Sequence, residues 1–157
     1  MKDLAKISML ISLSFIGSLV KIPGTSIAFD SMPAYFASIY ISPLAGGTVG
    51  ILGHMITAYL SGFPLSILIH SIVGVQMFLF VFIFGYVYKF KTIVNPIIVG
   101  VLLNGVVAPL MLIPVIGFKV SIGFIIPLSI VSFANIYLAY ISYNSISKRY
   151  RKGVFTR

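Results

Sequence analysis

Residues 65–88 read LSILIHSIVGVQMFLFVFIFGYVY, an apolar stretch that contains no charged residue. A helix needs about 20 predominantly apolar residues to cross the hydrocarbon core of a bilayer. The stretch therefore predicts a membrane-spanning helix, which ends where Lys89 and Lys91 follow. Its most polar members are His70 and Gln76. Polar groups inside an apolar span cost free energy, so these two residues become candidates for a functional site.

The composition of the whole chain agrees with this reading. Of its 157 residues, 59% are apolar and only 8% are charged. A soluble domain carries about a quarter charged residues, so an ordinary soluble fold and a disordered chain are both excluded. The net charge of +9 would suggest nucleic acid in a soluble protein. Here the charges lie between and beyond apolar stretches, so we predict a membrane protein with no nucleic-acid partner.

Six apolar segments are predicted to be helices, which makes the chain an all-α integral membrane protein with one domain over residues 1–157. The segments are about 4–20, 32–42, 44–60, 65–88, 93–113 and 120–145, followed by a basic tail over 146–157. The second segment is short for a full span. Pro127 predicts a kink in the sixth.

Basic residues predict how the segments are oriented. With a cytoplasmic N-terminus and six crossings, nine cations lie inside, and only Lys21 and Lys119 lie outside. The nine are Lys2, Lys6, Lys89, Lys91, Lys148, Arg149, Arg151, Lys152 and Arg157. Merging the second and third segments would separate Lys89 from the tail and remove this positive-inside bias. We therefore predict six transmembrane helices with both termini in the cytoplasm.

Residues that carry catalytic chemistry are largely missing. The sequence has no Gly-rich phosphate loop, so the chain cannot hydrolyse ATP by that route. Its only acids are Asp3 and Asp30, and it contains no cysteine. Two histidines without a carboxylate or thiolate beside them make a poor metal site. We expect a protein that is not an enzyme and that holds no metal and no cofactor.

Five neutral polar residues interrupt the apolar segments: His54, His70, Gln76, Asn104 and Asn135. In the six-helix layout, the first four lie between the outer surface and mid-depth and are predicted to line one outward-facing cavity. The alternative for each is a hydrogen bond between helices, worth about 1 kcal/mol or less. Every arginine lies in the C-terminal tail. A strongly anionic ligand would usually meet a guanidinium group, so we expect a neutral, flat ligand.

The linker over residues 21–31 is longer than a minimal turn and is predicted to close over the cavity as a lid. Within it, Asp30 is predicted to cap the helix that begins near Met32. Tyr35 and Phe63, at the outer edge, would either stack on a flat ligand or belong to an aromatic belt. Small residues at helical spacing, among them Gly46 and Gly50, predict close helix packing.

Several motifs resemble the substrate-binding S components of energy-coupling factor (ECF) vitamin transporters. They are Lys21-Ile22-Pro23, Ala28-Phe29-Asp30-Ser31-Met32-Pro33, Ser42-Pro43-Leu44-Ala45-Gly46-Gly47, Gly53-His54 and Gly62-Phe63-Pro64-Leu65. The resemblance covers the first four segments. The combination of Phe-Asp-Ser-Met-Pro with Gly-His and Gly-Phe-Pro is most similar to members assigned to a vitamin B12 precursor, dimethylbenzimidazole or α-ribazole.

The resemblance implies the substrate-binding subunit of an ECF-type ABC importer in a bacterial plasma membrane. Such a subunit binds a small heteroaromatic vitamin or precursor from outside, surrounded by membrane lipid. Its partners are a transmembrane coupling subunit and two cytoplasmic ATPases. The family docks through Ala-x-x-x-Ala on its first helix, and the matching residues here are Ser8 and Ser12. The expected ligand-binding residues are Asp30, Ser31, Tyr35, His54, Phe63, His70, Gln76 and Asn104.

Three other functions remain open from the sequence. The chain could be an S component for a different vitamin, or a membrane assembly protein whose polar residues only hold helices together. It could also be a self-contained secondary carrier, although it lacks the buried acids that coupled carriers usually use.

Overall fold

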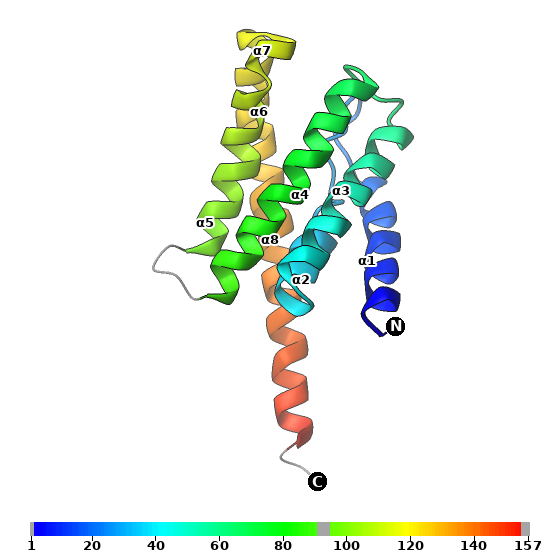
Figure 1. Cartoon of the computed structure of the whole chain (residues 1–157), viewed down its shortest axis with the longest axis vertical. Coiled ribbons are helices and arrows are strands. Elements are labelled where there is room, and N and C mark those ends of the chain that lie inside the picture. The colour runs from blue at the N-terminus through cyan, green and yellow to red at the C-terminus, as the bar shows by residue number, and fades with distance from the viewer. Residues whose placement is uncertain (1, 91–94, 155–157) are drawn as a thin grey trace.

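The computed structural model describes residues 2–90 and 95–154, with side chains over 3–90 and 95–148, and it is helical apart from short linkers (Figure 1). The predicted all-α fold is confirmed for this part of the chain. The elements in order are α1 (Lys2–Ser18), α2 (Met32–Tyr40), α3 (Pro43–Leu60), α4 (Ile67–Lys89), α5 (Pro96–Val101), the π-helix η1 (Leu102–Val107), α6 (Ala108–Met111), α7 (Ile113–Ile116) and α8 (Phe118–Val154).

Three helical segments are long and apolar enough to cross a bilayer. They are Ile67–Lys89, Pro96–Ile116 and Phe118–Lys148, where the sequence analysis placed 65–88, 93–113 and 120–145. The last helix continues to Val154 instead of ending at 145, because the sequence has no proline or glycine between residue 145 and Gly153.

Parts of the predicted layout lie outside the described residues. They are the side chains of Lys2, Lys91, Arg149, Arg151, Lys152 and Arg157, residues 93 and 94 of the fifth segment, and the last three residues of the tail.

Two prolines explain why α2 is short. Pro33 lies in its first turn, where a missing N–H costs nothing, and Pro43 begins α3 immediately afterwards. The side chain of Ser42 caps α3 by accepting a hydrogen bond from the Ala45 N–H at 3.1 Å. In Figure 1 the linker over 19–31 turns back at the upper end of α1 and runs along the bundle toward α2. The linker and α2 therefore traverse the bundle together.

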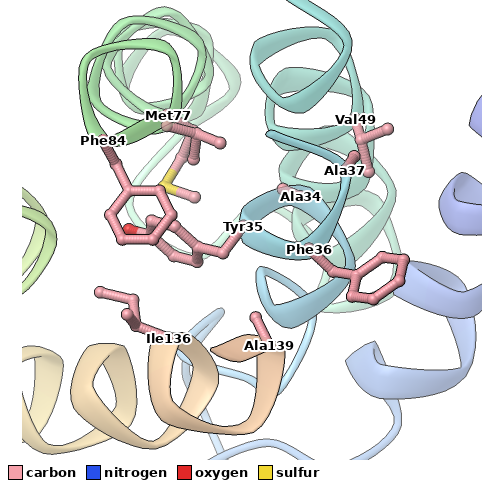
Figure 2. Packing of buried hydrophobic residues seen from close by; sticks show 10 residues of the cluster. Ala34, Tyr35, Phe36, Ala37, Val49, Met77, Phe84, Ile136 and Ala139 are labelled. Atoms are coloured by element: carbon pink, nitrogen blue, oxygen red, sulfur yellow. The ribbon is translucent and has the colours of Figure 1, made fainter. Parts of the chain in front are cut away.

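The core lies where α2, α4 and α8 meet. The Tyr35 ring of α2 is fully buried and packs edge-on against Phe84 of α4, with ring centroids 4.9 Å apart. Figure 2 shows Ile136 and Ala139 of α8 closing the other side of this cluster. Because aromatic rings bury large apolar areas, this contact contributes much of the packing energy that joins the three helices.

Glycines allow the backbones of α2 and α3 to approach closely. A Cβ atom at Gly46 would clash with the Ser38 side chain and lie 2.7 Å from Ser38 Cα. Ser38 itself meets Gly85 of α4, where an added Cβ would lie 2.8 Å from Ser38 Cβ. The predicted role of Gly46 in close packing is thus confirmed, and its partner is the short helix α2.

The π-helix η1 precedes a proline in the same continuous helix. Pro109 has no N–H to donate, so the preceding turn shifts its pairing, and the Ala108 N–H bonds to the Leu103 carbonyl five residues earlier. The Ala108 carbonyl accepts a bond from Gln76 Nε2 of α4 at 3.4 Å. The irregular turn therefore stays hydrogen-bonded inside the apolar bundle, and it contains Asn104.

Replacing Gly46 with alanine is expected to destabilise the protein by about 1–3 kcal/mol, because the new methyl group overlaps the backbone of α2. Gly123→Ala is the matched control. Gly123 lies on the exposed side of α8 with nothing within 4 Å, so alanine there is expected to be neutral or slightly stabilising. Thermal unfolding followed by circular dichroism measures both variants. Equal midpoints for Gly46→Ala and the wild type would contradict the packing described here.

Candidate ligand-binding site

A hollow opens between the linker, α3, α4, the irregular fifth helix and α8. Its empty volume is about 650 Å³ with the open mouth included. Its lining residues are Ser26, Ile27, Ala28, Asp30, Ser31, His54, His70, Val73, Met77, Asn104, Leu112, Phe124, Leu128, Val131 and Ser132. Apolar side chains form most of the wall, and the polar ones come from five different parts of the chain.

Five of the eight expected ligand-binding residues meet in this cavity. They are Asp30, Ser31, His54, His70 and Asn104. They come from segments that are far apart in sequence, the linker, α3, α4 and η1, so only the folded bundle brings them together.

The other three expected residues do not line the cavity. Tyr35 is part of the buried core, and the amide of Gln76 reaches Ala108 on α6. Phe63 lies in the turn after α3, with its ring centroid 6.0 Å from that of His70. Asn135 also lies outside the lining, where it binds the linker. The predicted depth of a polar residue in the bilayer is therefore not sufficient to identify it as a cavity-lining residue.

The sequence analysis missed the wall that α8 contributes. Phe124, Leu128, Val131 and Ser132 follow the three- and four-residue spacing of one helix face. On α4 the same spacing joins His70 to Val73 and Met77. The same spacing, followed along each helix from a polar residue in the apolar span, would have predicted these lining residues from the sequence.

The two histidines form a hydrogen-bonded pair beside the turn between α3 and α4. Nε2 of His54 lies 3.2 Å from Nδ1 of His70, and Nε2 of His70 lies 2.6 Å from the Pro64 carbonyl oxygen. Both rings are more than nine-tenths buried. The turn itself is unusual, because Phe63 and Leu65 have positive φ angles of 50° and 81°. The bond from His70 helps to hold this strained segment in place.

A second polar pair lies between η1 and α8. Asn104 Nδ2 donates a hydrogen bond to Ser132 Oγ at 2.8 Å. The π-turn brings the backbone near Asn104 against α8, since a Cβ at Gly105 would lie 2.6 Å from Ser129 Cα. The pair leaves the Asn104 carbonyl oxygen and the Ser132 hydroxyl hydrogen able to bind a ligand.

The carboxylate of Asp30 faces α3 instead of capping α2. The Thr57 hydroxyl lies within hydrogen-bonding distance of this carboxylate and 3.0 Å from the Gly53 carbonyl oxygen, so its single hydrogen is shared between two acceptors. Ser31 is the N-cap residue of α2, and its own side chain makes no capping hydrogen bond. The predicted capping role of Asp30 is therefore wrong, because a hydroxyl 27 residues later offers the carboxylate a buried partner.

Asp30 is 7% exposed, so its carboxyl group is held away from water. A buried carboxyl group is costly unless it is hydrogen-bonded, and Thr57 supplies that partner.

The linker is attached to the bundle at both of its ends. Asn135 of α8 donates to the Ala28 carbonyl at 3.1 Å and accepts from the Met32 N–H at 2.8 Å. Near the other end, Lys21 Nζ donates to the Leu60 carbonyl at 3.2 Å and to Ser61 Oγ at 2.9 Å. The predicted lid is thus held against α3 and α8, and its residues 26–28, 30 and 31 form part of the cavity wall.

The expected docking residues lie on the exposed side of α1. Ser8 and Ser12 are exposed, and their hydroxyls bond to carbonyls one turn earlier in the same helix, at 3.1 and 3.0 Å. Met9 and Ile16 are exposed nearby, at 73% and 59%. This side of α1 combines small serine residues with exposed apolar side chains, as a helix-packing surface would.

Comparison with known proteins gives one result. The model of the family described as "ECF transporter, substrate-specific component" matches residues 2–155 of the chain. No curated protein and no solved structure matches it.

Asp30→Asn is expected to stabilise the protein at neutral pH, because a neutral amide costs less to bury than a carboxylate and can still form a hydrogen bond with Thr57.

Thermal unfolding midpoints measured at neutral pH check this expectation. Asp3→Asn is the control, since Asp3 is exposed and pairs with Lys6. An Asp30→Asn midpoint below that of the wild type would contradict the expectation.

Proposed function

The chain belongs to the family of ECF transporter substrate-specific components, and we propose from this premise that it captures a small vitamin or vitamin precursor outside the cell for ATP-driven uptake. The ligand we propose is α-ribazole or dimethylbenzimidazole. The observation that carries the proposal is the cavity in which two imidazoles and an amide meet among apolar walls.

The lining chemistry supports a neutral, flat ligand. Among the residues that the structure describes, no lysine or arginine is part of the wall, and Asp30 is its one acidic residue. Met77, Phe124 and Leu128 offer apolar surface for a ring, while His54 and Asn104 offer hydrogen bonds at its edges. A phosphorylated ligand would find no cationic partner in this wall.

We also propose six membrane crossings with both termini in the cytoplasm of a bacterium. In Figure 1, the N-terminus, the C-terminal end of α4 and the C-terminus lie at one end of the bundle, and the basic residues Lys6, Lys89 and Lys148 belong to these segments. Lys21 follows the C-terminal end of α1, and Lys119 follows the C-terminal end of α7. The second crossing would consist of the linker together with α2.

This orientation supports access from outside. The cavity-lining residues His70 and Phe124 lie in the first two turns of α4 and α8, and those turns are near the end that carries Lys21 and Lys119. A ligand would reach the hollow from the outer surface, and the narrower inner half of the bundle is filled by the core around Tyr35.

The energy for uptake would come from partner chains. The sequence has no phosphate loop, so the proposal includes two cytoplasmic ATPases and a transmembrane coupling subunit. The exposed side of α1 around Ser8 and Ser12 is the surface we propose for the coupling subunit. The surrounding lipid would cover the remaining apolar faces.

A thermal-shift screen tests the proposal. The detergent-purified protein is heated with B vitamins, dimethylbenzimidazole or α-ribazole, and unfolding is followed by circular dichroism. A ligand present at 100 times its dissociation constant adds about 2.7 kcal/mol of stability. We expect one of the two B12 precursors to raise the midpoint. Another vitamin doing so would reassign the ligand within the family, and no shift with any compound would refute ligand capture as proposed.

Asn104→Ala is expected to weaken binding of that ligand about 10-fold, because it removes a hydrogen-bonding group from the wall. Asn144→Ala is the matched control, since Asn144 lies on α8 three turns beyond Ser132 and away from the cavity. Isothermal titration calorimetry measures both affinities. Equal affinities for the two variants would remove Asn104 from the site.

A further inference from the structure

We propose that the histidine pair fixes His54 as a hydrogen-bond acceptor toward the cavity, so that the ligand edge meeting it carries an N–H or O–H donor. The inference rests on the proposed function, because it assumes that a ligand occupies this cavity. It adds the chemical class of that ligand, a neutral azole or similar ring with a donor on one edge.

The assignment begins at Pro64. Its carbonyl oxygen can only accept a hydrogen bond, and it lies 2.6 Å from Nε2 of His70. The hydrogen of this bond must therefore be on His70 Nε2. His70 is 3% exposed and lies among apolar side chains, where a charged imidazolium would be costly, so the ring is neutral. A neutral ring with its hydrogen on Nε2 has a lone pair on Nδ1.

The next step passes to His54. Its Nε2 lies 3.2 Å from His70 Nδ1, which now acts as the acceptor. His54 must therefore donate from Nε2, and in the neutral ring its Nδ1 carries only a lone pair. Among the described residues, no group donates to this nitrogen, and His54 is part of the cavity wall. The pair thus presents an acceptor where a ligand would bind.

The polar groups of the cavity wall differ in character. His54 offers an acceptor, and the carboxylate of Asp30, elsewhere in the same wall, is an acceptor too. Asn104 and Ser132 together offer both a donor and an acceptor. The orientation of the ligand is therefore set by His54, where only a ligand donor fits.

This asymmetry predicts discrimination between close analogues. A benzimidazole with a free ring N–H supplies the donor, whereas methylation of that nitrogen leaves acceptor facing acceptor in a buried site. A site built to bond a ligand N–H or O–H rejects analogues that lack it, because its own polar group is left unpaired. α-Ribazole has no ring N–H and would have to meet His54 with a ribose hydroxyl.

Calorimetric titration with 5,6-dimethylbenzimidazole and with 1,5,6-trimethylbenzimidazole measures this discrimination. We expect the N-methyl compound to bind about 10- to 100-fold more weakly. In His70→Phe the ratio is expected to fall or reverse, because His54 loses the acceptor that holds its hydrogen on Nε2. Equal binding of both compounds by the wild type, or an unchanged ratio in His70→Phe, would overturn the inference.

A second measurement needs no ligand. The chain has only two histidines, so ¹⁵N-histidine labelling gives two ring systems in a two-bond ¹H–¹⁵N spectrum, assigned with His70→Phe. We expect both rings to be neutral with the hydrogen on Nε2 near pH 7.5. A hydrogen on Nδ1 of His54 refutes the inference even if a vitamin binds. If both rings are neutral with the hydrogen on Nε2 but neither benzimidazole binds, the acceptor assignment is supported and only the proposed ligand is refuted.

Discussion

The structure depends on how the linker between α1 and α2 satisfies its backbone inside an apolar bundle. In the hydrocarbon region no water is available to pair with a free N–H or carbonyl group, so irregular backbone persists only where protein supplies the partners. The Asn135 amide supplies two of these partners, since it donates to the Ala28 carbonyl and accepts from the Met32 N–H more than 100 residues earlier. One side chain of α8 thereby fixes the start of α2 and the segment before it.

The position of the linker then determines the polar wall of the cavity. Gly17 lets the chain run back against α1, because a Cβ there would lie 2.9 Å from the Phe29 carbonyl carbon. Held between α1 and α8, the linker directs the Asp30 carboxylate to Thr57 and leaves Ser31 on the cavity surface. The site is thus a product of the irregular segment, and the regular helices provide its apolar walls and the remaining polar groups.

What the sequence predicts well is decided by local properties. The uninterrupted apolar run over 65–88 corresponds to Ile67–Lys89, since length and hydropathy alone determine such a helix. The role of Asp30 depends on a contact with Thr57, which local spacing cannot reveal. The position of Gln76 along its apolar segment predicts that it lines the cavity, yet its neighbour Met77 lines the cavity and Gln76 does not. Successive helical residues point about 100° apart, so rotation about the axis matters as much as depth.

Unpaired polar atoms do not identify the site without its shape. The Tyr35 hydroxyl and Gln76 Oε1 are buried without partners, but neither residue borders the hollow. Asn135 also lies outside the lining, and its amide already makes three hydrogen bonds. Among the described residues, spare bonding capacity coincides with open space at His54, Asp30, the Asn104–Ser132 pair and the serines of the linker. A buried group that keeps a free lone pair beside a cavity recovers its desolvation cost when a ligand supplies the missing partner. For this reason we propose that a ligand would use the polar groups that border the cavity.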